Sequence, residues 1–147
     1  MSKEKVYLVQ TDTTVGFSSA NDEKLSIIKQ RPKTQKILQT VDSFKTLNEK
    51  TRVPKNFRKK IRNSNHTTFI YPNGNSFRVI EKDDLFHPFI SKFEALYSTS
   101  ANLTGNSFDE IFAKEKSDVI VYTKDGFSET ASSSIYKVNK QKILKIR

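Results

Sequence analysis

The sequence contains no cysteine, and this absence excludes several kinds of chemistry at once. Disulfide bonds, thiolate nucleophiles and sulfur-ligated zinc sites all need a cysteine side chain, and a chain without one is compatible with a reducing cytosol. The first twenty residues include four charged side chains and lack the apolar run of a signal peptide. No stretch reaches the 18 consecutive apolar residues of a membrane span. We therefore expect a cytoplasmic protein that has no membrane segment.

Glycine is scarce, with only four in the chain: Gly16, Gly74, Gly105 and Gly126. They are too far apart to form a phosphate-binding loop of the Walker A type or a dinucleotide fingerprint. If the protein binds a nucleotide, side chains and helix N-termini must hold the phosphates. The two histidines, His66 and His87, are not spaced as metal ligands, so we expect no protein-held metal site.

Basic residues exceed acidic ones, 26 against 16, which gives a net charge of +10. The excess is concentrated in KTRVPKNFRKKIR, residues 50–62, where no acidic residue occurs. This segment is either a solvated basic face or a surface for RNA or a polyphosphate. The candidate RNA-binding residues are Lys50, Arg52, Lys55, Arg58, Lys59, Lys60 and Arg62.

The order of apolar and turn-forming residues predicts a single α/β domain over residues 1–147, with a twisted mixed β-sheet flanked by helices. Strands are expected at 6–9, 67–71, 76–80, 98–100, 119–122, 134–138 and 143–146, and residues 36–41 fit a strand or a helix. Helices are expected after Asn21 up to Pro32, from Ser43 to Leu47, from Pro54 to Ile61, from Asp84 to Leu96, and after a capping box of Ser107 and Glu110. The phenylalanines of the fourth helix are expected in the core.

Four polar stretches lie mostly at strand ends or in turns, where ligands of α/β sheets bind. They are Thr11-Asp12-Thr13, Lys29-Gln30-Arg31, Ser98-Thr99-Ser100-Ala101-Asn102 and Ser132-Ser133-Ser134. Taken singly, each has a structural explanation, such as a cation at a helix C-terminus or a polar residue in a turn. Taken together, the cations neutralise phosphate charge while hydroxyl and amide groups orient it.

The first three stretches, in this order, resemble the signature segments of the YrdC-like threonylcarbamoyl-AMP synthase family. The Lys-x-Arg and Ser-x-Asn tetrad of that family corresponds to Lys29, Arg31, Ser100 and Asn102, and weaker matches extend the resemblance to nearly the whole chain. The resemblance implies a YrdC-like fold and a reaction in which L-threonine, bicarbonate and ATP give threonylcarbamoyl-AMP and pyrophosphate. The product serves threonylcarbamoyladenosine modification of tRNA, through downstream threonylcarbamoyl-transferase proteins.

The resemblance also implies roles for individual residues. The tetrad is assigned to catalysis, and Mg²⁺ is expected on the ATP phosphates, held largely by substrate and water. The nucleotide-binding set is Arg31, Gln35, Thr68, Ser100, Asn102 and Arg147, and the threonine-binding set is Thr11, Thr13, Thr40, Ser98 and Ser133.

The sequence departs from the family pattern at several positions. Gln10 and Val15 replace a proline and an aromatic residue, Lys137 stands where an acidic residue is usual, and Ser64-Asn65-His66 replaces a Pro-Gly-Pro. Loss of both prolines predicts a looser entry to the strand that bears Thr68. Two alternatives to the enzyme therefore stay open: a non-catalytic YrdC-like module that binds tRNA or double-stranded RNA, and a paralogue with another nucleotide-dependent carbamoyl-type transfer.

Overall fold

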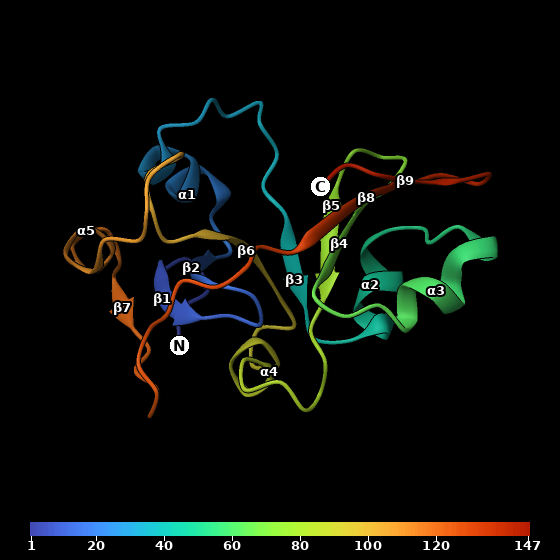
Figure 1. Ribbon diagram of the computed structural model, residues 1–147. Helices are drawn as coiled ribbons and strands as arrows, with labels where there is room; N and C mark the ends of the chain where they lie inside the picture. The colour runs from blue at the N-terminus through green and yellow to red at the C-terminus, as the bar shows by residue number, and fades with distance from the viewer. The chain divides into compact units, whose positions relative to one another are not determined.

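The computed structural model describes all 147 residues (Figure 1). Contacts within the chain divide it into two compact units: unit 1 is Met1–Ile37 with Leu96–Ser132, and unit 2 is Leu38–Ala95 with Ser133–Arg147. The prediction of one domain over residues 1–147 stays a prediction. None of the helices is long and apolar enough to cross a membrane.

Unit 1 contains a four-stranded part of the sheet in the order β7-β1-β2-β6. Its elements are β1 (Tyr7–Gln10), β2 (Val15–Ser19), α1 (Asp22–Lys29), β6 (Ala95–Ser100), α5 (Glu110–Lys116) and β7 (Val119–Ile120). β2 pairs antiparallel with both β1 and β6, whereas β7 pairs parallel with β1. Apolar side chains of the strands pack against Leu25 of α1 and Ala113 of α5, so both helices cover this core.

Local sequence determines where α1 begins and ends. The Asn21 side chain accepts a hydrogen bond from the backbone N of Lys24 at 3.1 Å, which satisfies one of the free donors of the first turn. The helix stops at Lys29 because Gln30 takes a left-handed conformation with φ 55°, two residues before Pro32. The predicted cap of this helix is confirmed, and the helix ends at Lys29, earlier than the predicted stop at Pro32.

Unit 2 holds the strands in the order β3-β5-β4-β8-β9. Its elements are β3 (Gln39–Val41), α2 (Phe44–Lys50), the 3₁₀ turn η1 (Lys55–Phe57), α3 (Arg58–Arg62), β4 (Thr67–Ile70), β5 (Ser76–Val79), α4 (His87–Ile90), β8 (Ser134–Val138) and β9 (Ile143–Lys145). The ambiguous segment 36–41 therefore contributes a strand. β4 with β5 and β8 with β9 form the two predicted antiparallel pairs, while β3 lies parallel to β5 and β8 parallel to β4. The predicted mixed sheet with helices on it is confirmed.

The long helix predicted from Asp84 to Leu96 is wrong. Only His87–Ile90 is α-helical, and Leu96 belongs to strand β6. The Asp84 side chain accepts from the backbone N of Phe86 at 2.8 Å and forms a turn, and Glu94 takes a left-handed conformation with φ 66° directly before the strand. The phenylalanines are nonetheless buried as predicted, since Phe86, Phe89 and Phe93 have ring centroids 5.7 and 5.3 Å apart in succession.

Two predictions in the second half of unit 1 also need correction. Asp109, not Ser107, caps α5, because its carboxylate accepts from the backbone N of Ile111 at 3.0 Å and of Phe112 at 3.3 Å. An aspartate directly before the helix thus displaces the predicted capping box. Strand β7 is only two residues long, and Tyr122, which was predicted to lie in it, is exposed. As an edge strand it pairs on one side only.

Gly16 in β2 offers a test of the close approach between β2 and β6. A Cβ atom at this position would lie 2.9 Å from the backbone O of Thr99 and 3.3 Å from Cγ2 of Thr11. Since the Thr99 carbonyl belongs to the sheet, it cannot move without disturbing the strand pairing. We expect Gly16→Ala to lower the free energy of unfolding by about 1–3 kcal/mol in urea denaturation.

Ser18→Ala on the same strand is the matched control. The hydroxyl of Ser18 is buried without a hydrogen-bond partner, so its removal should leave stability equal or higher. A Gly16→Ala variant as stable as Ser18→Ala would contradict the proposed clash.

Candidate functional site

The last residue of α1, Lys29, reaches the end of strand β6 with its ammonium group. Lys29 Nζ lies 2.9 Å from the backbone O of Ser100, 3.2 Å from Ser100 Oγ and 2.9 Å from Asn102 Oδ1, and it also contacts the backbone O of Asn102. The side chain is only 2% exposed. The structure thus brings together three of the four residues of the predicted tetrad.

The ammonium of Lys29 is a buried cation whose described partners are uncharged oxygens. Burial, and secondarily the neighbouring charge of Arg31, lower the pKa of Lys29 to about 8. An ammonium has three protons to donate, and four oxygens already compete for them. Lys29 therefore holds the loop after β6 in place, and its donors are already engaged by the protein.

Ser100 and Asn102 are fixed by this cluster. Ser100 Oγ donates to Asn102 Oδ1 at 2.5 Å, and Asn102 Nδ2 donates to the backbone O of Asn106. The amide of Asn102 is oriented at both ends as a result. Both side chains are only partly buried, so they can still meet a ligand while their positions are set.

Arg31, the fourth residue of the tetrad, lies two residues beyond the end of α1 and lines a cavity of about 410 Å³. Lys29, Gln35, Thr104 and Asn106 line the same cavity. The Nε atom of Arg31 is buried and has no hydrogen-bond partner, and burial lowers the pKa of the guanidinium. A desolvated cation at a cavity of ligand size favours an anionic ligand there.

Gln35 was predicted with Arg31, and the structure places both at this cavity. Thr104 and Asn106 were not predicted, although they belong to the loop that follows the Ser-x-Asn segment. Their role becomes visible only in three dimensions, because Asn106 contributes its backbone carbonyl rather than a recognisable side chain.

Thr11 and Thr13 form the turn between β1 and β2. Thr11 Oγ1 donates to the backbone O of Thr14 at 2.5 Å and accepts from the backbone N of Thr13 at 3.2 Å. Gly16 pairs with Ser100 across β2 and β6, so this turn and the Ser100 end of β6 share one edge of the sheet. The described hydroxyl bonds of Thr11 shape the turn. Ser98 lies two residues before Ser100 on β6, and its side chain is buried. The assignment of these three residues to threonine binding stays a prediction.

A second polar cluster lies within unit 2. Thr68 Oγ1 and Ser133 Oγ are 2.8 Å apart and buried, and Arg147 donates from Nε and Nη2 to the backbone O of Ser133 at 3.1 and 2.8 Å. Arg78, which was not assigned a role from the sequence, donates to Thr68 Oγ1 at 3.4 Å and is 4% exposed. The sequence signal that could have identified Arg78 is a single charged residue between the apolar residues Phe77 and Val79 of strand β5. Thr40 is buried opposite Arg78 in the register of β3 and β5.

Residues 64–66 stand where the family that the sequence resembles has Pro-Gly-Pro, and the last of them has a backbone that excludes proline. His66 has a φ of 49°, which proline cannot adopt. The backbone O of His66 accepts from the N of Ser134 at 3.2 Å, and its ring Nε2 lies 3.9 Å from Asp84 Oδ2. The entry to β4 is therefore held by these contacts instead of by proline rings.

The seven candidate RNA-binding residues all lie in unit 2, from the last residue of α2 through η1 to the last residue of α3, and all are exposed. No group of three or more His, Asp or Glu side chains is placed to hold a metal ion.

No protein-family model and no curated protein matches the chain. Solved structures do match its fold. The crystal structure of E. coli YciO superposes with a TM-score of 0.76 at 17% identity, and covers 99% of this chain and 83% of YciO. The H234A/Y235A variant of P. abyssi Sua5 gives 0.75 at 16% identity, over 97% of this chain and 52% of Sua5. P. abyssi Sua5 in complex with L-threonine gives 0.75 at 16% identity, over 97% of this chain and 50% of that one.

The chain thus spans about half the length of the Sua5 structures that it matches. At these identities the likeness concerns the fold. Nearly every residue of the chain falls within it, and the predicted fold class is confirmed: this protein has the YrdC-like fold of Sua5 and YciO.

Proposed function

We propose that the chain is a threonylcarbamoyl-AMP synthase-type enzyme, a nucleotidyltransferase that uses L-threonine, bicarbonate and ATP. The observation that carries the proposal is the cluster of Lys29, Ser100 and Asn102 beside the cavity lined by Arg31. Two further facts support it: the fold is that of Sua5, and one of the matching Sua5 structures contains L-threonine.

In the proposed reaction the amine of threonine attacks the carbon of bicarbonate, and loss of water gives a carbamate. A carbamate oxygen then attacks the α-phosphorus of ATP, and the bond from that phosphorus to the bridging oxygen breaks, which releases pyrophosphate. Bicarbonate, the carbamate, ATP and pyrophosphate are all anionic, so the protein must mainly position reactants and offset charge.

The residues of unit 1 fit these tasks. Arg31 offers a permanent cation with several donors to an anion in the cavity. Ser100 and Asn102 present a hydroxyl and an amide whose orientations are set by the protein. Lys29 is a positioning residue, because its contacts hold these two side chains and its charge adds to the field at the cavity.

Magnesium is proposed as part of the substrate, bound to the phosphates of ATP. The cluster around Lys29 supplies hydroxyl and amide groups and no carboxylate, which is a poor donor set for a resident Mg²⁺.

The reaction can be tested by measuring pyrophosphate release from the purified chain with MgATP, L-threonine and bicarbonate. We expect release only when both co-substrates are present. Release that does not depend on threonine would favour a paralogue with another carbamoyl-type transfer, and no release in any mixture would favour a non-catalytic module.

Replacement of Arg31 should separate binding from folding. We expect Arg31→Gln to weaken MgATP binding by about 10–100-fold, as loss of one charge-assisted contact to a phosphate would. The melting temperature of the variant should equal that of the wild type, because the Nε atom of Arg31 makes no hydrogen bond within the protein that the substitution would remove. Isothermal calorimetry measures the affinity. Lys33→Gln, an exposed cation two residues further along, is the control and should bind MgATP normally. Equal affinities in both variants would place the nucleotide elsewhere.

The lowered pKa of Lys29 predicts a pH dependence of stability. Between a folded pKa of about 8 and the ordinary value of about 10.4, the unfolded chain binds the extra proton, so the free energy of unfolding rises with pH. Burial raises the pKa of Tyr7, Tyr71 and Tyr97, which lowers stability only near pH 10 and above. Measurements from pH 7.5 to 9.5 avoid that effect.

Urea denaturation of the wild-type chain should therefore show a gain of about 1–2 kcal/mol over this range relative to Lys29→Met, which has no group to titrate. Parallel pH profiles for the two proteins would mean that Lys29 is not desolvated in the folded state.

A further inference from the structure

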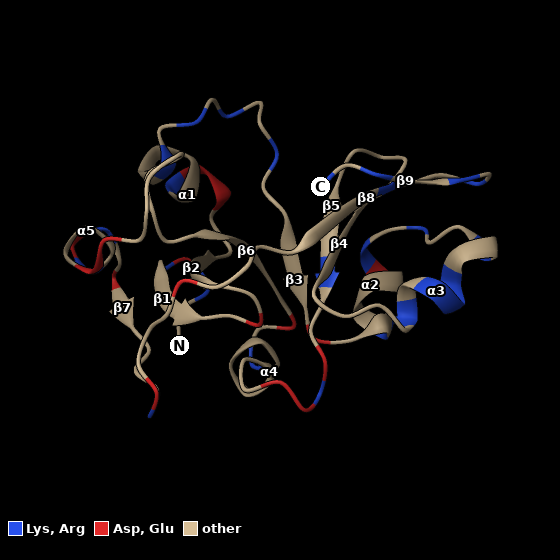
Figure 2. Cartoon of the chain, in the orientation of Figure 1, with Lys and Arg blue, Asp and Glu red and all other residues tan.

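The whole net charge of the protein resides in unit 2. This unit contains 16 of the 26 basic residues and 6 of the 16 acidic ones, which leaves +10, whereas unit 1 contains ten of each and is neutral. Figure 2 shows the basic residues of unit 2 along α3, the segment before it, and the β8–β9 hairpin. A single-sign surface of this kind attracts a polyanion.

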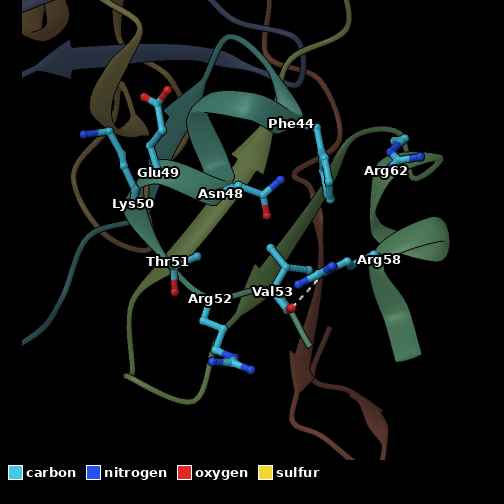
Figure 3. Close-up of a pocket in the computed structure, with 9 residues that line it drawn as sticks. All are labelled: Phe44, Asn48, Glu49, Lys50, Thr51, Arg52, Val53, Arg58 and Arg62. Carbon is cyan, nitrogen blue, oxygen red and sulfur yellow. Dashed lines mark hydrogen bonds between the residues drawn. The ribbon is translucent and has the colours of Figure 1, made fainter. Parts of the chain in front are cut away.

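A pocket of about 680 Å³ opens within this basic region, between α2 and α3 (Figure 3). Its volume lies in the range of pockets that hold small organic ligands. The lining combines cations with an aromatic ring and an amide: Phe44, Asn48, Arg58 and Arg62 are among the residues that form it. The Phe44 ring and the Asn48 amide distinguish this pocket from a basic surface that is only solvated.

A flat group already covers the aromatic wall of the pocket. The guanidinium of Arg62 lies over the ring of Phe44, 4.7 Å from its centroid. Nucleic-acid bases stack on guanidinium planes, so a base can lie on the face of Arg62 that is turned away from Phe44. The Asn48 side chain points into the pocket beside this wall, where its amide can both donate to and accept from a base edge (Figure 3).

Arg58 completes the pocket from the side of α3. Its Nε lies 3.4 Å from the backbone O of Val53, which holds the guanidinium at the pocket while its terminal nitrogens can meet a phosphate. Glu49 also lines the pocket, and a carboxylate there opposes a phosphate but can accept from the amino group of a base. The pocket lining thus offers guanidinium groups for a phosphate, and amide and carboxylate groups for a base edge.

The basic surface continues from the pocket onto the hairpin. Asn56 Nδ2 of η1 donates to the backbone O of Lys140 at 3.2 Å, which places the turn of the β8–β9 hairpin beside η1. Further lysines follow on this hairpin at 137, 142 and 145. These side chains can hold phosphates that flank a nucleotide in the pocket.

We propose that unit 2 binds single-stranded nucleic acid, with an unpaired nucleotide in the pocket between α2 and α3 and the flanking phosphates on α3 and the hairpin. A base inside a duplex cannot stack on the guanidinium of Arg62, because its faces are already covered by neighbouring bases. The proposal depends on unit 2 alone and does not require the chain to synthesise threonylcarbamoyl-AMP.

The test compares two double variants of the full chain that lose the same charge on the same helix. Arg58→Gln with Arg62→Gln alters the pocket, whereas Lys59→Gln with Lys60→Gln alters α3 outside the residues that line it. Fluorescence anisotropy measures binding of a labelled, unstructured ten-nucleotide RNA, of the DNA of the same sequence, and of the RNA annealed to its complement. Melting temperatures check that both variants fold.

We expect the pocket pair to weaken binding of the better single strand at least about tenfold, since stacking and a fixed phosphate contact are both lost, and the control pair to weaken it about threefold or less. On the duplex the two pairs should have equal, small effects. Asn48→Ala, which changes no charge, should weaken single-strand binding without altering its dependence on salt.

Three results would overturn the proposal. Equal losses for the two pairs on the single strand would indicate a diffuse basic surface without a nucleotide pocket. Competition by a poly-glutamate peptide as strong as that by unlabelled RNA would indicate an acidic protein partner. Absence of binding to every probe at about 50 mM salt would indicate a solvated face, because phosphate contacts are strongest at low salt.

Discussion

The structure of unit 1 depends on how the ammonium of Lys29 is accommodated away from water. A cation that is 2% exposed must be surrounded by oxygens, and here the end of β6 and the loop after it provide them. The same contacts join the C-terminus of α1 to β6 and set the side chains of Ser100 and Asn102. Of the four residues that the resemblance assigns to catalysis, Lys29 holds Ser100 and Asn102 in place, and Lys29 and Arg31 both line the cavity.

The two cations of the tetrad differ because the helix ends between them. Lys29 is the last helical residue, and the left-handed Gln30 turns the chain before Arg31. Their like charges add to the desolvation that lowers the pKa of Lys29. Part of the cost of burying this pair would be recovered when an anion enters the cavity, which is the physical reason to regard the cavity as a binding site instead of a packing defect.

Features determined by neighbouring residues could be predicted from the sequence, and features determined by distant ones could not. Asn21 and Ser43 cap their helices as predicted, because a cap needs only the next three residues. The helix predicted from Asp84 does not extend to Leu96 because residues from Ala95 onward belong to β6, whose pairing depends on strands distant in the sequence. The tetrad could be found by its resemblance to the pattern of the YrdC-like family. The hydrogen bonds that occupy the Lys29 ammonium could not be predicted, since the backbone oxygens that accept them lie 71 and 73 residues away in the sequence.

The replaced Pro-Gly-Pro shows how a departure in sequence can mislead about rigidity. Proline rings are one way to fix a backbone, but at residues 64–66 the left-handed His66, its carbonyl bond to Ser134 and its proximity to Asp84 hold the entry to β4 by other means. A proline at position 66 would require a negative φ and would therefore break this arrangement. The looser entry to β4 expected from the sequence assumed that nothing replaced the prolines. In the structure, Thr68 lies two residues beyond this turn and is buried against Ser133 and Arg78, so its hydroxyl is positioned without them.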